Sequence, residues 1–266
     1  MAEATTSGGE SGQTTPILPF TVTDQHLIAC GVQKADAGKY APLLASRMPA
    51  YKIDTKLRAA HFLAQVLHES GRLRITRENL NYSAKGLVKT FKSFQMCEVP
   101  TPAKTTGPAV YKQCQYKGKT RPGSFSLTES LAQAAAYAHQ PDAIADRAYA
   151  RLGGHLYIGR GLIQVTGKGN YHSLSEWAHK DYEHHPEWLE IPDDAVTSAL
   201  WFWSTHNAKT GKKTYKDLNT LADEDNILAI TRVINGGTNG LADRRQILHK
   251  CKKAFGGMLP VPKPKS

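Results

Sequence analysis

The chain has few cysteines, and their spacing does not indicate a metal site. Cys30, Cys97, Cys114 and Cys251 are the four cysteines among 266 residues. They are too few for a disulfide scaffold and too widely spaced for a zinc finger. Cys97 and Cys114 lie in one polar stretch, where they either close a short loop as a disulfide in an oxidising compartment or remain free thiols. We therefore expect neither a metal ion nor a cofactor.

The sequence also lacks a membrane-spanning run and the pattern of a secretory signal. No apolar run approaches the ~20 residues that cross a bilayer, and the stretch MAEATTSGGESGQTTP lacks the charged-then-apolar order of a signal peptide. The longest apolar cluster, AVTSALWFW, predicts a buried helix. We expect synthesis in the cytoplasm without a signal peptide, so a target outside the cytoplasm requires another route of delivery.

Positive charge is in excess. The formal net charge is +11 and the isoelectric point is near 9.4, which favours an anionic partner such as nucleic acid, an acidic membrane surface or the carboxylate-rich bacterial cell wall. The chain has no aromatic-basic stacking motif and no helix-turn-helix signature, so we expect no nucleic-acid partner. A non-enzymatic module that binds cell wall or nucleic acid stays open as an alternative.

Composition divides the chain into three parts, the second of which contains an insertion. Residues 1–20 are rich in Gly, Ser and Thr and predict a flexible leader, and 257–266 form a basic tail. Residues 21–256 predict one catalytic domain. Within it, 95–124 is rich in Pro, Gly, Thr and Lys and reads as a loop insertion, with a short hairpin around YKQCQYKG.

Helical periodicity dominates the predicted domain. The Thr23-Asp24-Gln25 segment caps a helix that Gly31 ends, and TKLRAAHFLAQVLHE predicts a nearly buried helix over 55–69. Further helices are predicted in NYSAKGLVKTFKSF, LTESLAQAAAYAH, PDAIADRAYARLGG, DDAVTSALWFWSTHN, DEDNILAITRVIN and LADRRQILHKCKKAF. The expected fold class is mainly α (α+β, lysozyme-like), a bilobed helical domain with a small β element and a central substrate cleft.

Two carboxylates lie close together in LHESGRLRITRENLNYSA. Inverting hydrolysis of a glycosidic bond needs a protonated acid and a carboxylate base ~6.5–9.5 Å apart. Glu69 ends an apolar helix, where desolvation and the negative helix end favour the protonated acid, and Glu78 on the following loop can be the base. The alternatives are a solvated Glu69 and a surface ion pair of Glu78 with Arg74 or Arg77.

His68 and Glu69 also begin a zinc-peptidase pattern, HExxH, but Arg72 stands where the second histidine belongs. This departure argues against a zinc peptidase. The pair His184-His185 is expected in a surface loop.

Polar residues gather in two further segments. In GRGLIQVTGKGNY, alternation places Gln164 and Thr166 on one face of an extended segment, with Asn170 and Tyr171 following. Such side chains can orient water and bind sugar groups, although an ordinary glycine-rich turn is the alternative. The spacing fits neither GxGxxG nor GxxxxGK[ST]. The second segment, INGGTNGLADRR, contains Asn235, Asn239 and Arg244, and the alternative there is that the Asn and Gly residues merely end a helix.

Together, AQVLHESG, ENLNYSA, GRGLIQVTG with NY, and VINGGTNGLADRR resemble glycoside hydrolase family 19, the chitinase-like enzymes, and particularly their bacteriophage endolysin branch. The resemblance runs from about residue 23 to 255. It implies that Glu69 is the general acid, Glu78 the general base and Thr166 a helper that holds the attacking water. The substrate contacts that it implies are His68, Tyr82, Gln164, Asn170, Tyr171, Asn235 and Arg244.

Two departures from the family bear on the branch. The 95–124 stretch is longer than expected of compact endolysins. Plant chitinases carry their second carboxylate farther along and an acidic residue after the NGG turn, where this chain has Thr238-Asn239. The second departure favours the endolysin branch over a chitinase.

The expected function is therefore that of a lysozyme-type muramidase, a monomer that cleaves the β-1,4 MurNAc–GlcNAc bonds of peptidoglycan. A lytic transglycosylase and a chitinase are the enzymatic alternatives. A phage endolysin released through a holin and an injected antibacterial effector with an immunity protein are both expected settings, and both act on the cell wall in the periplasm.

Overall fold

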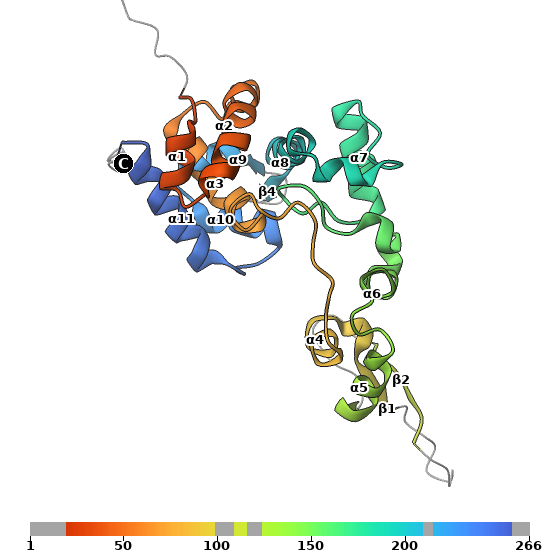
Figure 1. Cartoon of the computed structure of the whole chain (residues 1–266). Coiled ribbons are helices and arrows are strands. Elements are labelled where there is room, and N and C mark those ends of the chain that lie inside the picture. The colour runs from red at the N-terminus through yellow and green to blue at the C-terminus, as the bar shows by residue number, and fades with distance from the viewer. Residues whose placement is uncertain (1–19, 99–108, 116–123, 210–214, 257–266) are drawn as a thin grey trace, which may run out of the picture.

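The computed structural model describes residues 20–98, 109–115, 124–209 and 215–256, which fold mainly into helices with two small antiparallel sheets (Figure 1). The helices are α1 (Asp24–Ala29), α2 (Lys34–Arg47), α3 (Lys56–Glu69), α4 (Ala84–Thr90), α5 (Leu127–Ala135), α6 (Pro141–Ala148), α7 (Lys168–Ala178), α8 (Pro192–Thr205), α9 (Leu218–Asp223), α10 (Ile227–Asn235) and α11 (Leu241–Ala254). The strands are β1 (Met96–Glu98), β2 (Tyr111–Gln113), β3 (Phe125–Ser126), β4 (Asn207–Lys209) and β5 (Tyr215–Asp217). The predicted mainly α class is confirmed. Among the described residues, no helix is long and apolar enough to cross a bilayer.

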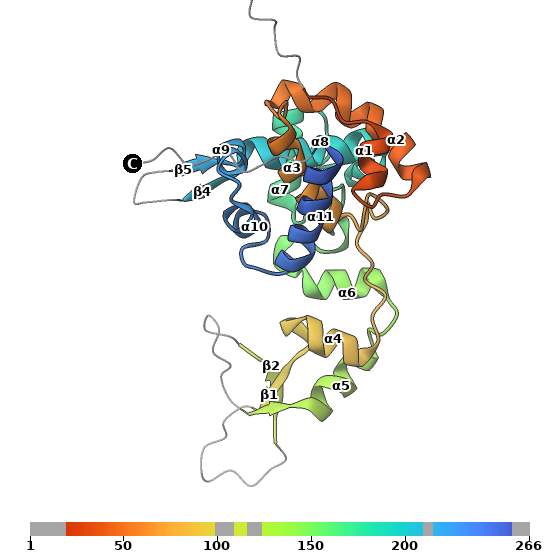
Figure 2. The ribbon, with the colours of Figure 1, turned by 90° about the vertical axis from the view of Figure 1, so that its left-hand side faces the viewer.

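The helices form two lobes with separate hydrophobic cores. The large lobe contains α1–α3 and α7–α11, and its core is one continuous cluster. The small lobe contains α4–α6 and the β1–β3 sheet, and its core includes Leu87, Phe94 and Ile144. Both views show α4, α5 and β1–β2 lying together to one side of the large lobe (Figures 1 and 2). The predicted bilobed arrangement is present.

Helix α3 lies at the centre of the large lobe. Thr55 caps it by accepting a hydrogen bond from the Arg58 amide, and every residue from 59 to 67 is buried, as the sequence predicted. Helix α11 packs along α3 and contacts α1. A disulfide between Cys30 and Cys251, whose Cα atoms are 5.0 Å apart, joins the end of α1 to α11. The sequence alone does not predict that these two cysteines pair.

The predicted 95–124 insertion contributes strands to the small lobe. Strand β1 pairs antiparallel with β2 and with β3, so the YKQ segment forms a strand that pairs with Met96–Glu98. The second half of the predicted hairpin around YKQCQYKG, residues 116–118, lies outside the described residues. The pairing of β1 with β2 places Cys97 opposite Lys112 and brings it to Cys114, and the two cysteines form a disulfide. Residues 99–108 and 116–123 of the insertion, the 1–19 part of the leader and the 257–266 tail lie outside the described residues.

Candidate active site

Glu69 is the last residue of α3 and is held by an arginine from α11. Arg244 is 1% exposed and forms an ion pair with Glu69, whose side chain is 21% exposed. The same guanidinium donates to Gln65 Oε1 at 2.6 Å. Gln65 and Glu69 are four residues apart and therefore lie on one helix face. The sequence predicts apolar surroundings for Glu69. In the structure a buried cation, Arg244, lies beside it instead, because α11 packs against this face of α3.

His68 is held beside Glu69 by the first turn of α11. Its Nδ1 lies 2.6 Å from Asp243 Oδ2, and Arg72 donates to Asp243 Oδ1 at 2.7 Å. The hydrogen bond from Arg72, followed by that from His68, lowers the pKa of Asp243 to about 2 despite partial burial. Arg72 stands where a zinc-peptidase pattern would have its second histidine. Through its hydrogen bond to Asp243 it joins α11 to the end of α3. A methyl group on Gly240 would overlap the His68 ring, so this turn passes directly against His68.

Glu78 is oriented by hydrogen bonds from the small-lobe side and from the glycine-rich loop. Its Oε2 accepts from the Tyr149 hydroxyl at 2.9 Å, and its Oε1 accepts from the Gly159 amide at 2.6 Å. Burial and then the neighbouring Glu78 charge raise the pKa of Tyr149, so its hydroxyl stays a donor at neutral pH. Arg77 lies 3.9 Å from Glu190, so its ion pair is with that residue. The alternative surface pair with Arg74 or Arg77 is not what the structure shows.

Gln164 and Thr166 come together with Glu78 around Gly159. A Cβ atom placed on Gly159 would lie 3.0 Å from Gln164 Oε1, 3.3 Å from Thr166 Oγ1 and 3.5 Å from Glu78 Cβ. As predicted, the side chains of Gln164 and Thr166 lie on the same side of the segment. The segment is not the extended strand that was expected. Gln164 has φ of +56°, and Arg160 and Val165 pair across a tight turn, so a turn brings the two side chains together.

The two residues that follow this loop differ in exposure. Asn170 is exposed and donates from Nδ2 to the Thr166 carbonyl at 2.9 Å. Tyr171 is fully buried. Its hydroxyl donates to the Ile158 carbonyl at 2.7 Å and accepts from Arg160. A direct substrate contact is therefore the wrong role for Tyr171 in this structure: as the first-turn residue of α7 it packs into the core and supports the loop from beneath.

The remaining predicted contacts, Asn235 and Tyr82, belong to different lobes. Asn235 ends α10, where its side chain accepts from the Gly237 amide at 2.9 Å and donates to the Asn239 carbonyl at 2.6 Å. It therefore shapes the 236–240 turn that passes His68. Tyr82 is partly buried in the small lobe and packs edge-on against Phe91 at 5.4 Å between ring centroids.

Three residues that contact the candidate site residues were not predicted from the sequence. Gln65, Tyr149 and Asp243 contact Arg244, Glu78 and His68 respectively. Gln65 alone had a detectable cue, a polar residue in a buried helix at four-residue spacing from Glu69. Within the described ranges, no group of three or more His, Cys, Asp or Glu side chains is arranged to hold a metal ion.

The fold matches that of chitinases in solved structures. Chitinase C from Streptomyces griseus HUT6037 superposes with a TM-score of 0.53 at 18% identity, over 92% of this chain and 97% of that one. A bacterial family 19 chitinase gives a TM-score of 0.53 at 16% identity, over 90% and 97% of the two chains. At this level of identity the likeness shows a chitinase-like fold.

Sequence similarity gives the family. The chain is 35% identical over 199 residues to a glycosyl hydrolase family 19 domain-containing protein of Haemophilus influenzae, which covers 71% of this chain and 76% of that protein. An acidic endochitinase of Petunia hybrida is 35% identical over 95 residues, or 32% of this chain and 37% of the relative. No protein-family model matches. The chain belongs to glycoside hydrolase family 19.

Proposed function

We propose that this glycoside hydrolase is a peptidoglycan hydrolase, a lysozyme-type muramidase that cleaves β-1,4 MurNAc–GlcNAc bonds with inversion. The observation that carries the proposal is the gathering of Glu78, Gln164 and Thr166 around Gly159. The Glu78 carboxylate accepts from the Gly159 amide, and a carboxylate with an amide and a hydroxyl nearby is the arrangement that can activate and hold a water molecule. Glu69 supplies the second carboxyl from the end of α3.

The proposed reaction is a single displacement. Glu69 donates its proton to the oxygen of the scissile bond while Glu78 takes a proton from the attacking water, and the anomeric carbon inverts. Thr166 donates to the Gln164 carbonyl at 3.0 Å, so its hydroxyl oxygen has a lone pair with which to hold the water. Arg244 stabilises the negative charge that Glu69 carries once its proton has left.

Peptidoglycan is favoured as the substrate by the charge of the chain. The net charge of +11 attracts a polymer with peptide carboxylates, whereas chitin is uncharged. Chitin hydrolysis is the second candidate, because the relatives of this family are named as chitinases. A lytic transglycosylase would need only one of the two carboxylates. Tyr149 and Gly159 donate hydrogen bonds that orient Glu78, and this orientation of a second carboxylate favours hydrolysis.

The proposed setting is bacteriolytic. A monomer without a cofactor would act on the cell wall in the periplasm, either as a phage endolysin that passes a holin or as an injected effector that an immunity protein neutralises. A holin gene or an immunity gene beside the coding sequence would distinguish the two settings.

The test compares Glu69→Gln and Glu78→Gln with the control Glu176→Gln, an exposed glutamate of α7 whose side chain is 71% accessible. We expect each of the first two variants to lose at least ~100-fold in hydrolysis of purified cell walls, as loss of a general acid or base does, and the control to keep wild-type activity. Product analysis by mass spectrometry should show hydrated reducing ends. Anhydro-muramyl products would overturn hydrolysis, and release from soluble chitin alone would overturn the muramidase assignment.

A further inference from the structure

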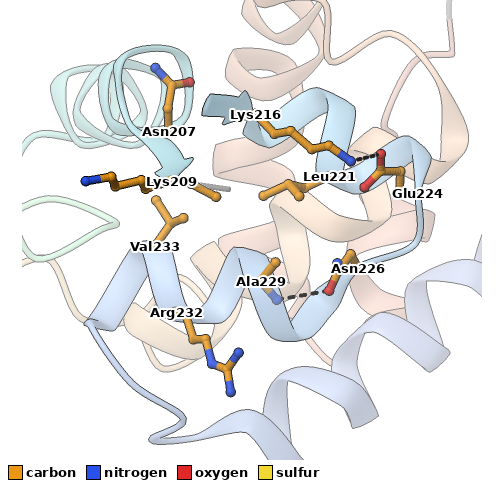
Figure 3. A pocket seen from close by; sticks show the side chains of 10 residues that line it. Asn207, Lys209, Lys216, Leu221, Glu224, Asn226, Ala229, Arg232 and Val233 are labelled. Atoms are coloured by element: carbon orange, nitrogen blue, oxygen red, sulfur yellow. Dashed lines mark hydrogen bonds and ion pairs between the residues drawn. The ribbon is translucent and has the colours of Figure 1, made fainter. Parts of the chain in front are cut away.

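A hollow lies in the large lobe between the β4–β5 hairpin and helices α9 and α10 (Figure 3). Its volume is about 380 Å³, which is within the range of small-molecule sites, roughly 300–1,000 Å³. The side chains of Ala208, Leu221, Ala229 and Val233 make an apolar floor. The hollow is therefore large enough and apolar enough to take a small ligand with methyl-sized groups.

The charges at the rim of this hollow do not balance. Lys216 forms an ion pair with Glu224, which neutralises the only carboxylate among the described lining residues. Lys209 and Arg232 are exposed, and no other described side chain pairs with either. Figure 3 shows Lys216 turned toward Glu224, whereas the Lys209 side chain extends from β4 and the Arg232 side chain extends in another direction from α10. Two cations are thus left for an anionic ligand.

The hollow also offers directional hydrogen-bonding groups. Asn226 accepts from the Ala229 amide at 3.0 Å and so caps α10, which leaves its amide nitrogen as a donor. Asn207 contributes a second exposed amide from β4. Amide donors beside unpaired cations suit a carboxylate better than an uncharged sugar.

Helix α10 connects the hollow with the candidate active site. Arg232 lines the hollow, and Asn235, three residues later on the same helix, shapes the turn against His68. Residues at this spacing lie on the same side of a helix, roughly 4.5 Å apart along its axis. A branch that leaves a glycan near Asn235 would therefore meet Arg232.

We propose that the hollow between the β4–β5 hairpin and α10 binds the acidic stem peptide of peptidoglycan. The carboxylates of the peptide would pair with Lys209 and Arg232, and its alanine methyl groups would rest on the apolar floor. This inference rests on the proposed function, since it assigns to the same substrate a second point of contact. It also gives a structural basis for preferring peptidoglycan over chitin.

The test uses the wild-type chain and the free tripeptide L-alanyl-γ-D-glutamyl-diaminopimelate, which contains no glycosidic bond. Binding followed by NMR titration should weaken by about tenfold or more in Lys209→Ala/Arg232→Ala, because charge-assisted hydrogen bonds are lost. The matched control Lys34→Ala/Lys253→Ala removes the same charge from exposed sites on α2 and α11 and should bind as wild type does. The tripeptide with its carboxylates amidated should not bind.

Equal binding by the two double variants, or binding of the amidated peptide, would overturn the proposal. So would capture of acidic proteins by this face with no response to the tripeptide. Wall hydrolysis by the wild type is measured in parallel. If hydrolysis is retained while the tripeptide fails to bind, only the hollow is wrongly assigned; if walls are not hydrolysed, the proposed function itself fails.

Discussion

At the residue scale, each candidate catalytic glutamate is oriented by a side chain far from it in sequence. Arg244 holds Glu69, and the Tyr149 hydroxyl donates to Glu78. Removing one partner of a buried ion pair leaves an uncompensated charge and costs several kcal/mol, whereas removing one hydroxyl leaves the packing of the ring intact. Tyr149 is therefore the better position at which to separate orientation from folding.

We expect Tyr149→Phe to lower kcat by about tenfold, the effect of roughly 1.4 kcal/mol from one lost hydrogen bond, with KM unchanged. Steady-state kinetics on cell walls measures both. A control is Tyr137→Phe, since Tyr137 belongs to the same lobe and packs against Phe94. A change in KM alone would show that Tyr149 does not act through Glu78.

At the scale of elements, the contact between α3 and α11 places the site. Asp243, in the first turn of α11, joins His68 and Arg72 at the end of α3. Its side chain is 38% exposed, so solvent screens part of the interaction. The pKa of Asp243 is about 2, below its ordinary value of 3.8. A lowered pKa of this kind stabilises the folded state when the carboxyl is ionised.

The stability contributed by Asp243 should be full above about pH 5 and lost as the pH falls from about 4 to 2. After screening, we expect Asp243→Asn to lower the free energy of unfolding at pH 7 by about 1 kcal/mol. The difference from wild type should shrink toward zero near pH 2. Urea unfolding at a series of pH values measures this, with the exposed Asp142→Asn of α6 as a control. A difference that does not vary between pH 5 and pH 2 would contradict the assignment.

At the scale of the whole molecule, the chain has two lobes with separate cores and carries more positive than negative charge. The net charge is +11, and screening shortens its reach to about 8 Å at 0.15 M salt. If attraction to wall carboxylates concentrates the enzyme, added salt should weaken binding to walls.

We expect hydrolysis of purified cell walls at low substrate to fall by about tenfold or more between 0.01 and 0.5 M NaCl, because the Debye length contracts from about 30 Å to a few ångströms. Any hydrolysis of soluble chito-oligosaccharides should change little over the same range, since they are uncharged. Initial rates on the two substrates at each salt concentration provide the comparison. An equal salt effect on both would show that charge does not act through the substrate.

The sequence by itself determined most of the helices and the family. Hydrophobic periodicity located α3, α5, α6, α8, α10 and α11, because burial of one helix face leaves a pattern in neighbouring residues. It did not locate α2, whose pattern is interrupted by Gly38 and Pro42, or the β4–β5 hairpin, whose strands have three residues each. The predicted helix over 82–94 is shorter in the structure because the chain is extended at Phe91.

Only the tertiary structure decided how the site residues are used. The motifs predicted Glu69, Glu78, Gln164 and Thr166, but no local pattern could assign Arg244 to Glu69 or bury Tyr171 beneath the loop. These roles depend on contacts such as that between Gln65 and Arg244, which are separated by 179 positions. A sequence pattern records which face of an element is apolar; which two faces meet is settled by the packing of the whole chain.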